Sequence, residues 1–350
     1  MEKNKTQAPR KITIKHIAKV AGVSVSTVSR ALRHDPKANV KTTQRVLDIA
    51  QKLNYYPDYH AKTMRLRKTG TIGVILNDLT NPFYSEILAE IGEVLYKKEY
   101  SMFICYSNWD LDRERKNVLS LLSRRVDGVV ICPVHEESEN IQLLSDNGVE
   151  VVIIDCYPFF KENSYVYTEH GKGAIIATEY LIRNGHRNIL LFTGPLHGSL
   201  EHNFVNGYFE TLKKYGIEAR EEFMIRSKEL TIESAYETFK KLITENRQGI
   251  GIDFTAVVTI CDLFAVGIYR VANELGFNIP GNYSIVGYDN IDVTAALAPP
   301  LTTIHQPRKE IGTESVKILL NNIENETMKD QKIVTFEPFI VVRGSVRKLN

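Results

Sequence analysis

Cysteine is scarce in this sequence. Only four of its 350 residues are cysteines, and Cys105, Cys132, Cys156 and Cys261 are scattered, with no CxxC pair and no histidine at metal-ligand spacing. This pattern argues against a disulfide framework and against a zinc site, and it is typical of free buried thiols in a reducing compartment. We therefore predict no metal site.

Long apolar runs are also missing. The first ten residues, MEKNKTQAPR, contain no apolar segment of the kind found in secretory signals. Runs such as VEVVIID have the length of a strand and are far too short to span a bilayer. The sequence therefore predicts a cytoplasmic protein that has no membrane partner.

Signatures of catalysis are missing as well. The sequence has no Walker loop, no complete Rossmann fingerprint and no GxSxG nucleophile turn. The stretch HGKGAIIA, with Gly171 and Gly173, resembles a nucleotide-binding loop, but it lacks the third glycine and the acidic residue about 20 positions further on. His186 lies in a helix-to-strand connection, and we interpret it as structural. We predict no cofactor, no catalytic residue and no enzymatic activity; an α/β sugar-modifying enzyme stays a remote alternative.

Charge is distributed unevenly along the chain. Residues 1–70 hold 16 Lys and Arg against 4 Asp and Glu, whereas residues 71–350 hold 28 against 38, so the formal net charge of +2 hides the asymmetry. A basic head on an acidic body indicates a polyanionic partner for the head. The alternative is a basic surface that is only solvated.

The head, residues 12–54, predicts three short helices. Apolar residues recur at i, i+3, i+4 and i+7 in the first and third of them. These residues are Ile14, Ile17, Ala18, Ala21, Val46, Ile49, Ala50 and Leu53. Gly22 and Val23 separate the first helix from the second, which Ser24 can cap. Helix, short glycine-containing turn, helix is the helix-turn-helix arrangement, in which the second helix reads the major groove of DNA.

The predicted second helix has inward-facing Val28, Ala31 and Leu32, and a polar outer face. Short side chains let its backbone approach the groove, hydroxyls suit phosphate oxygens, and arginine suits a guanine edge. We predict that Val25, Ser26 and Arg30 contact bases and that Thr27 and Ser29 contact phosphates. The predicted DNA-contacting residues of the head are Thr13, Ser24, Val25, Ser26, Thr27, Ser29 and Arg30. The alternative is a helical hairpin with a polar exterior.

Residues 58–70 predict a short helix and a linker. Asp58 can cap a helix that ends at about Leu66, which is too short to be stable unless it packs against a second copy and DNA. Met64 would be its apolar wedge in the minor groove, beside basic residues. The predicted contacts are Asp58, His60, Ala61, Met64 and Arg65. Without DNA we expect a disordered basic linker.

From Thr71 onward, short apolar runs alternate with amphipathic stretches. The runs are TIGVIL, SMFICYS, DGVVICPV, VEVVIID, NILLFTG, AVVTI and YSIVGYD. Strands without strict alternation, separated by helices, predict parallel sheets covered on both faces, in two groups divided near Thr168. The fold class is α/β with an all-α head. Because parallel sheets bind ligands beyond the carboxyl ends of their strands, two facing sheets would form a cleft.

Seven stretches together resemble the LacI/GalR family of bacterial repressors, in the family's order and over nearly the whole chain. They are TIKHIAKVAGVSVSTVSRAL, VLDIAQKLNYYPD, IGVILNDLTNPFYSEI, RRVDGVVICP, LIRNGHRNILLFTG, IPGNYSIVGYDN and PPLTTIHQP. The resemblance implies a homodimer or sometimes a tetramer, a palindromic operator, and a hinge helix that orders on DNA. It also implies a body like the periplasmic sugar-binding proteins, in which the chain crosses three times between two subdomains.

These implications give a division of the chain. Residues 1–57 form the DNA-binding domain, 58–70 the hinge and linker, and 71–350 the effector-binding and dimerisation domain. Within the body, one subdomain comprises about 71–168 plus 301–330, and the other about 169–300 plus 331–350. The crossings are expected near Thr168, Pro300 and Gln331.

The strand ends of the body carry aromatic and acidic residues. Aromatic rings can stack on the C–H face of a sugar, and carboxylates accept hydroxyl protons, so the set suits a neutral polyhydroxylated ring. Each residue alone could instead be a helix cap or part of the core. Most of these positions match the family's pocket. The predicted effector-binding residues are Phe83, Tyr84, Asn108, Trp109, Asp155, Phe204, Asp262, Asp289 and Gln306.

The sequence departs from the family pattern in places. Asp58 stands where Asn is usual and Met64 where Leu is usual, so we expect weaker operator bending. Phe204 stands where Arg is usual, Cys261 where Asn is usual, and Glu169-His170 where Asp-Asn is usual. Without that arginine, an anionic effector lacks its fork-shaped partner.

We therefore predict a sequence-specific DNA-binding repressor controlled by a neutral sugar or glycoside. Control by a nucleoside-type ligand or by a partner protein stays open. A transport binding protein would share the body, but the basic head and the missing signal peptide argue against it.

Overall fold

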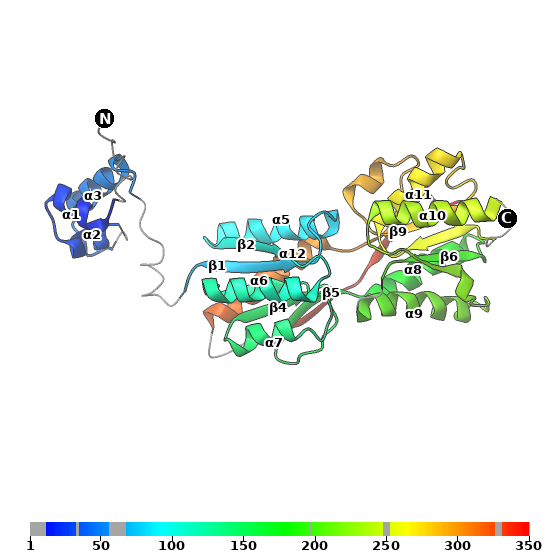
Figure 1. The fold of residues 1–350 in the computed structure, drawn as a ribbon, viewed down its shortest axis with the longest axis horizontal. Helices are drawn as coiled ribbons and strands as arrows, with labels where there is room; N and C mark the ends of the chain where they lie inside the picture. The colour runs from blue at the N-terminus through cyan, green and yellow to red at the C-terminus, as the bar shows by residue number, and fades with distance from the viewer. Residues whose placement is uncertain are drawn as a thin grey trace, which may run out of the picture. The chain divides into compact units, whose positions relative to one another are not determined.

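The computed structural model describes residues 12–32, 35–55, 68–195, 198–247, 253–325 and 331–349. The chain divides into two compact units, Met1–Thr69 and Gly70–Asn350. Figure 1 shows the helices of the first unit in blue and the sheets of the second from cyan to red. Among the described residues, every helix is too short or too polar to cross a membrane.

The first unit contains α1 (Ile14–Ala21), α2 (Val25–Ala31) and α3 (Val40–Lys52). One residue from each helix, Ile17, Val28 and Val46, is fully buried in a shared core, as their helical spacing predicts. α1 ends at Gly22, whose φ of 64° lies in the left-handed region that glycine adopts without a steric penalty. Ser24 then caps α2 by accepting a hydrogen bond from the Thr27 amide at 3.1 Å. The predicted helix-turn-helix arrangement is confirmed.

The first sheet of the second unit has the strand order β11-β5-β4-β3-β1-β2, with every pair parallel. Its strands are β1 (Thr71–Leu76), β2 (Ser101–Tyr106), β3 (Gly128–Ile131), β4 (Glu150–Ile154), β5 (Ser164–Thr168) and β11 (Ile333–Phe336). The covering helices are α5 (Pro82–Lys97), α6 (Leu111–Arg124), α7 (Glu139–Asp146) and α12 (Arg308–Glu324). α5 packs on α12 over one face and α6 packs on α7 over the other, so the strands read as continuous apolar runs.

The second sheet has the strand order β12-β10-β9-β8-β6-β7, and only β12 is antiparallel. Its strands are β6 (Ile189–Thr193), β7 (Met224–Arg226), β8 (Ala256–Thr259), β9 (Ser284–Asp289), β10 (Thr302–His305) and β12 (Phe339–Val341). Its helices are α8 (His170–Arg183), α9 (Ser199–Lys214), α10 (Ile232–Arg247) and α11 (Asp262–Leu275), with short 3₁₀ helices η1 (Glu221–Phe223) and η2 (Asp292–Ala296). α8 and α9 lie on one side of the sheet and α10 and α11 on the other (Figure 1). The α/β class with an all-α head is confirmed.

The chain crosses between the sheets three times. β5 of the first sheet ends at Thr168, and α8 follows against the second sheet. β10 of the second sheet ends at His305, and α12 begins at Arg308 against the first. β11 of the first sheet ends at Phe336, and β12 of the second begins at Phe339.

The crossings expected near Pro300 and Gln331 are therefore placed too early. Residues 302–305 first add a strand beside β9 of the second sheet, and residues 333–336 first add a strand beside β5 of the first. Pro299 and Pro300 signal a turn, but a turn signal does not say which sheet the next strand joins. Residues 302–305 therefore belong to the second subdomain, and residues 333–336 belong to the first.

Candidate functional site

The outer face of α2 is exposed and rich in hydroxyls. Ser24, Val25, Ser26 and Arg30 are exposed, whereas Thr27 and Ser29 are half-buried. The Ser24 hydroxyl lies 2.7 Å from that of Ser26 and 2.8 Å from that of Thr27. The hydroxyls therefore form one cluster at the start of the helix, with the longer Arg30 one helical turn or more beyond it.

Thr13 lies at the start of α1, and it is exposed. Its backbone amide donates a hydrogen bond to His16 Nδ1 at 3.3 Å, which helps to begin the helix. The other predicted DNA contacts lie outside the described residues. These are Asp58, His60, Ala61, Met64 and Arg65.

A cavity that opens to solvent lies in the second unit, lined by residues from both subdomains. It adjoins the carboxyl ends of the strands, where parallel sheets bind ligands. Six of the predicted effector-binding residues line it: Phe83, Tyr84, Trp109, Asp155, Asp289 and Gln306. The structure thus brings together side chains that are far apart in the sequence.

Three predicted residues do not line the cavity. Asn108 is exposed beyond β2. Phe204 is fully buried and packs edge-on against Tyr288, with the ring centroids 5.1 Å apart. Asp262 is also fully buried, and it accepts hydrogen bonds from the Thr303 hydroxyl at 2.7 Å and the Ile291 amide at 2.9 Å.

Asp262 connects three segments of the second subdomain next to the cavity. Its two hydrogen bonds connect the start of α11 to β10 and to the residue before η2. Burial raises the pKa of Asp262 to about 7, because the desolvation of the carboxylate outweighs the hydrogen bonds from Thr303 and Ile291. The preceding residue, Cys261, reaches the cavity in its place.

Further lining residues were not predicted. They are Asn77, Asp78, Asn81, Pro133, Val134, His135, Glu136, Cys156, His170, Gly198, Ser199, Leu200, Glu201, Leu230, Ile260, Cys261 and Tyr288. Many of them follow β1, β3 or β4 directly, and the rule that parallel strands bind ligands at their carboxyl ends could have found those. Ser199 and Glu201 belong to the first turn of α9, and no single strand end indicates them.

A chain of polar contacts crosses the cavity between the subdomains. Tyr84 donates a hydrogen bond to Asp155 Oδ2 at 3.1 Å. Asp155 Oδ1 lies 3.2 Å from Nε2 of His170 on the opposite subdomain, within ion-pair distance but not aligned as a hydrogen bond. Burial, with the Cys132 thiol and the Asp155 carboxylate adding to it, raises the pKa of Tyr84 well above its usual value. Tyr84 is therefore a neutral hydrogen-bond donor.

A second contact crosses the cavity at the start of α9. Glu136, which follows β3, accepts a hydrogen bond from the Ser199 amide at 3.2 Å, and Glu201 accepts one from the Gly198 amide at 3.0 Å. Amides at a helix N-terminus stabilise carboxylates. Burial nevertheless raises the pKa of Glu201 above its usual value.

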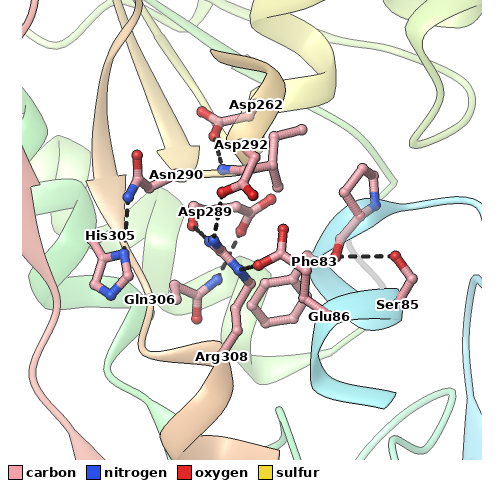
Figure 2. Close-up of polar contacts among 12 residues, drawn as sticks. Phe83, Ser85, Glu86, Asp262, Asp289, Asn290, Asp292, His305, Gln306 and Arg308 are labelled. Carbon is pink, nitrogen blue, oxygen red and sulfur yellow. Dashed lines mark hydrogen bonds and ion pairs between the residues drawn. The ribbon is translucent and has the colours of Figure 1, made fainter. Parts of the chain in front are cut away.

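Arg308 contacts residues of both subdomains (Figure 2). Its Nε donates to Glu86 of α5 at 2.6 Å, and its Nη1 donates to the main-chain carbonyl of Asp289 at the end of β9. Gln306 donates to the Asp289 carboxylate at 2.8 Å. Burial, followed by repulsion from the Asp262 carboxylate, raises the pKa of Asp289 well above its usual value. The hydrogen bonds from Gln306 and Arg308 thus hold Asp289 beside the crossing between β10 and α12.

Two family models match the chain. Residues 13–58 match the model described as bacterial regulatory proteins, lacI family, and residues 69–340 match periplasmic binding proteins and sugar binding domain of LacI family. The chain belongs to the LacI family. The resemblance identified from the sequence is confirmed over both the head and the body.

Curated members of the LacI family resemble the chain over almost its full length. The transcriptional repressor PurR of Glaesserella parasuis is 31% identical over 343 residues, which covers 97% of the chain and 99% of PurR. The ribose operon repressor of Escherichia coli K12 is 30% identical over 335 residues, covering 95% of the chain and 99% of the repressor. These relatives are DNA-binding transcriptional repressors and not enzymes.

Solved LacI-family structures share the fold. A lac repressor dimer bound to operator and the anti-inducer ONPF is 25% identical, with a TM-score of 0.82, 97% of the chain covered and 100% of that structure. A LacI-family regulator from Enterococcus faecium with bound ribose is 28% identical, with a TM-score of 0.71, covering 80% of the chain and 100% of that structure. The regulator CelR in complex with cellobiose is 26% identical, with a TM-score of 0.71, covering 96% and 100%.

Proposed function

We propose that this protein is a sequence-specific repressor that binds a palindromic operator as a homodimer and is controlled by a small polyhydroxylated effector in the cavity. The observation that carries the proposal is the presence, in one LacI-family chain, of an exposed hydroxyl-rich helix and a polar cavity between two subdomains. The first can read DNA, and the second can sense a small molecule.

The head supports the DNA-binding part of the proposal. α2 exposes small side chains together with Arg30, so that its backbone can approach base edges closely. The excess of basic residues in 1–70 supplies the contacts to phosphates that position the helix in the groove. We propose Val25, Ser26 and Arg30 as the base-reading residues, with Thr27 and Ser29 on the phosphates.

The edge strand β2 supports the homodimer. Nothing pairs with its outer side among the described residues, and its Phe103, Ile104 and Tyr106 are each exposed by 40–48%. An unpaired strand edge with large exposed apolar side chains is a surface that proteins cover. Since the related lac repressor is a dimer, we propose that a second copy of this chain covers it.

The composition of the cavity supports the effector class. Phe83 and Trp109 offer aromatic faces, and Asp155 and Asp289 offer acceptors for hydroxyl groups. No described lining residue is Lys or Arg, so a phosphate or carboxylate group would find no cationic partner. Structures of related regulators contain bound cellobiose or bound ribose. Both ligands are sugars without an acidic group, as the composition of this cavity favours.

Contacts across the cavity give the effector a way to act. Asp155 meets His170, and Glu136 meets the Ser199 amide, from opposite subdomains. An effector that replaces these contacts favours one angle between the subdomains over another. The populations of the two conformations then shift by an amount set by the difference in the effector's affinity for them. Because β2 belongs to one of these subdomains, the shift would reach the proposed dimer surface.

Selection of a target from a random duplex pool by the full-length protein tests the proposal. We expect enrichment of a palindromic sequence and a change in its affinity when the effector is added. If no sequence is enriched, with or without sugars and nucleosides, the proposal is overturned. Enrichment of a target with no response to any small molecule would instead support control by a partner protein.

A further inference from the structure

The cavity lining is rich in acidic residues. Five of its lining residues are carboxylic acids, and the only basic residues among the described ones are His135 and His170. The acids come from both subdomains: Asp78, Glu136, Asp155, Glu201 and Asp289. A binding site that concentrates negative charge without a protein cation leaves that charge for a ligand to balance.

The guanidinium group of Arg308 offsets the Asp289 carboxylate only in part, as a nearby positive charge. The Nε of Arg308 donates to Glu86, and its Nη1 donates to the main-chain carbonyl of Asp289 and not to the Asp289 carboxylate (Figure 2). After burial itself, the carboxylates of Asp262 and Asp155 both raise the pKa of Asp289. Burial and the two neighbouring carboxylates therefore disfavour the ionised form of Asp289.

Three of the five acids have an ordinary structural explanation. Asp78 accepts hydrogen bonds from the amide and hydroxyl of Thr80, both at 2.7 Å. Glu136 and Glu201 accept from amides at the start of α9. Asp155 and Asp289 remain, one on each subdomain. Asp155 accepts from the Tyr84 hydroxyl and lies near His170, and Asp289 accepts from Gln306.

Unsatisfied polar atoms gather at the same cavity. Eight buried side-chain nitrogen or oxygen atoms among the described residues lack a hydrogen-bond partner, and five of them belong to cavity-lining residues. These five are Asp155 Oδ1, His170 Nε2, Ser199 Oγ, Tyr288 Oη and Gln306 Oε1, of which the first two face each other at 3.2 Å without hydrogen-bond geometry. Tyr288 and Gln306 are each only 1% exposed. Because native proteins pair their buried polar groups, the concentration here points to groups that a ligand supplies.

The backbone around the cavity supports this interpretation. Five non-glycine residues with positive φ follow or end strands at this edge of the sheets: Asn108, Trp109, Asp155, Asp289 and Asn290. The other three described ones, Asn54, Glu99 and Arg125, follow helix ends, where this conformation is common. Unfavourable backbone conformations persist at binding sites because the surroundings hold them.

We propose that the effector carries a protonated amine, as in an amino sugar or amino polyol, and that Asp155 accepts its ammonium group. This inference rests on the proposed function and narrows its effector class. An ammonium group has three donors and no acceptor, so it can take the place of His170 Nε2, which lies 3.2 Å from Asp155 Oδ1, and bring a positive charge into the acidic cavity. The faces of Phe83, Trp109 and Tyr288 in the same lining suit a cation. The ligand hydroxyls then serve Gln306 Oε1 and the Tyr288 hydroxyl.

Calorimetric titration of the full-length protein with matched ligands tests the inference. The probes are glucosamine, galactosamine and mannosamine, each beside its hydroxyl parent and its N-acetyl derivative, together with glucosamine 6-phosphate. We expect at least one free amine to bind more than tenfold tighter than its parent and its N-acetyl derivative. Equal or tighter binding of the parent, tighter binding of the phosphate, or failure of every amine to bind overturns the inference.

A variant locates the ammonium group. Asp155→Asn keeps the size of the side chain and removes its charge, and it should abolish the preference for the amine over the hydroxyl parent. Asp253→Asn, at an exposed position away from the lining, is the matched control and should keep that preference. The melting temperature confirms that both variants fold. An unchanged preference in Asp155→Asn contradicts the assignment.

Operator selection separates the two proposals. A protein that selects a palindrome but binds no amine overturns this inference alone. A protein that selects no DNA sequence overturns the proposed function, whatever it binds in the cavity.

Discussion

The head and the cavity use polar residues in opposite ways. In the head, Ser24 and Ser26 are exposed and Thr27 is half-buried, and their hydroxyls already contact one another, so each has a partner before DNA arrives. In the cavity, Tyr288 and Gln306 are almost fully buried and have polar atoms without partners. Leaving a buried polar atom unpaired costs stability, whereas an exposed one is solvated by water. Ligand binding can therefore supply hydrogen bonds that the cavity lacks, whereas the hydroxyls of the head have partners without DNA.

Charge divides the two regions in the same way. The first 70 residues are strongly basic, and the cavity lining has acids without Lys or Arg among its described residues. A polyanion is attracted to the first and repelled by the second. One chain can thus bind DNA and a small molecule without competition between the two ligands.

Removal of the head is the strongest test of this division. Residues 71–350 alone should bind no duplex DNA, whereas the full-length protein should lose about 10³-fold or more in affinity between 50 and 200 mM salt, as expected from several phosphate contacts. Filter binding at the two salt concentrations measures both. DNA binding by the truncated body would show that the acidic unit takes part in the interface, and the division of labour would fail.

Arg308→Ala should have the largest effect on stability. The residue is 6% exposed, and loss of its side chain leaves Glu86 and the Asp289 carbonyl without their partner, so we expect a cost of about 3 kcal/mol. Calorimetry should show a lower melting temperature for the body, with the transition of the head unchanged. Arg183→Ala, which breaks an exposed ion pair with Glu179 on α8, is the control and should leave the melting temperature almost unchanged. Equal effects of the two substitutions would show that Arg308 does not connect the subdomains.

Arg30→Ala should change the sequence preference of the head. The loss of a bidentate contact to a base costs about 1–3 kcal/mol, and only on the preferred sequence. Lys41→Ala, at an exposed position of α3, should weaken binding to all sequences alike. Competition between the selected operator and a scrambled duplex measures both variants. If both lose only affinity that is independent of sequence, Arg30 does not read bases.

The two regions also differ in how much of them the sequence could predict. The residues of the α2 face lie within a single helix, and helical spacing alone separates Val28 in the core from Arg30 at the surface. The cavity is assembled from loops of two sheets, so its membership depends on where each strand joins. The strand ends pointed to Asp155 and Asp289, which line the cavity, but could not show that Asp262 turns toward Thr303.

The crossings and the first turn of α9 were beyond the reach of sequence reasoning for a similar reason. A proline turn before Thr302 does not reveal that the next strand pairs with β9. Nor does the sequence around Ser199 reveal that its amide faces Glu136 from the other subdomain. Both facts come from long-range pairing, which local patterns do not encode.

Tyr288→Phe gives the smallest and sharpest test of the comparison. The substitution removes only a buried hydroxyl that has no partner, so the free protein should keep its stability or gain up to about 1 kcal/mol. The same change should weaken effector binding, because the ligand loses a hydrogen bond. Thermal melting with and without the effector identified by titration measures both effects.

Tyr208→Phe is the matched control. The buried hydroxyl of Tyr208 donates to the Ile189 carbonyl at 2.7 Å, so its removal should lower stability and leave effector affinity unchanged. If Tyr288→Phe destabilises the free protein as much as Tyr208→Phe does, the hydroxyl of Tyr288 already has a partner, and the contrast between a satisfied head and an unsatisfied cavity is wrong.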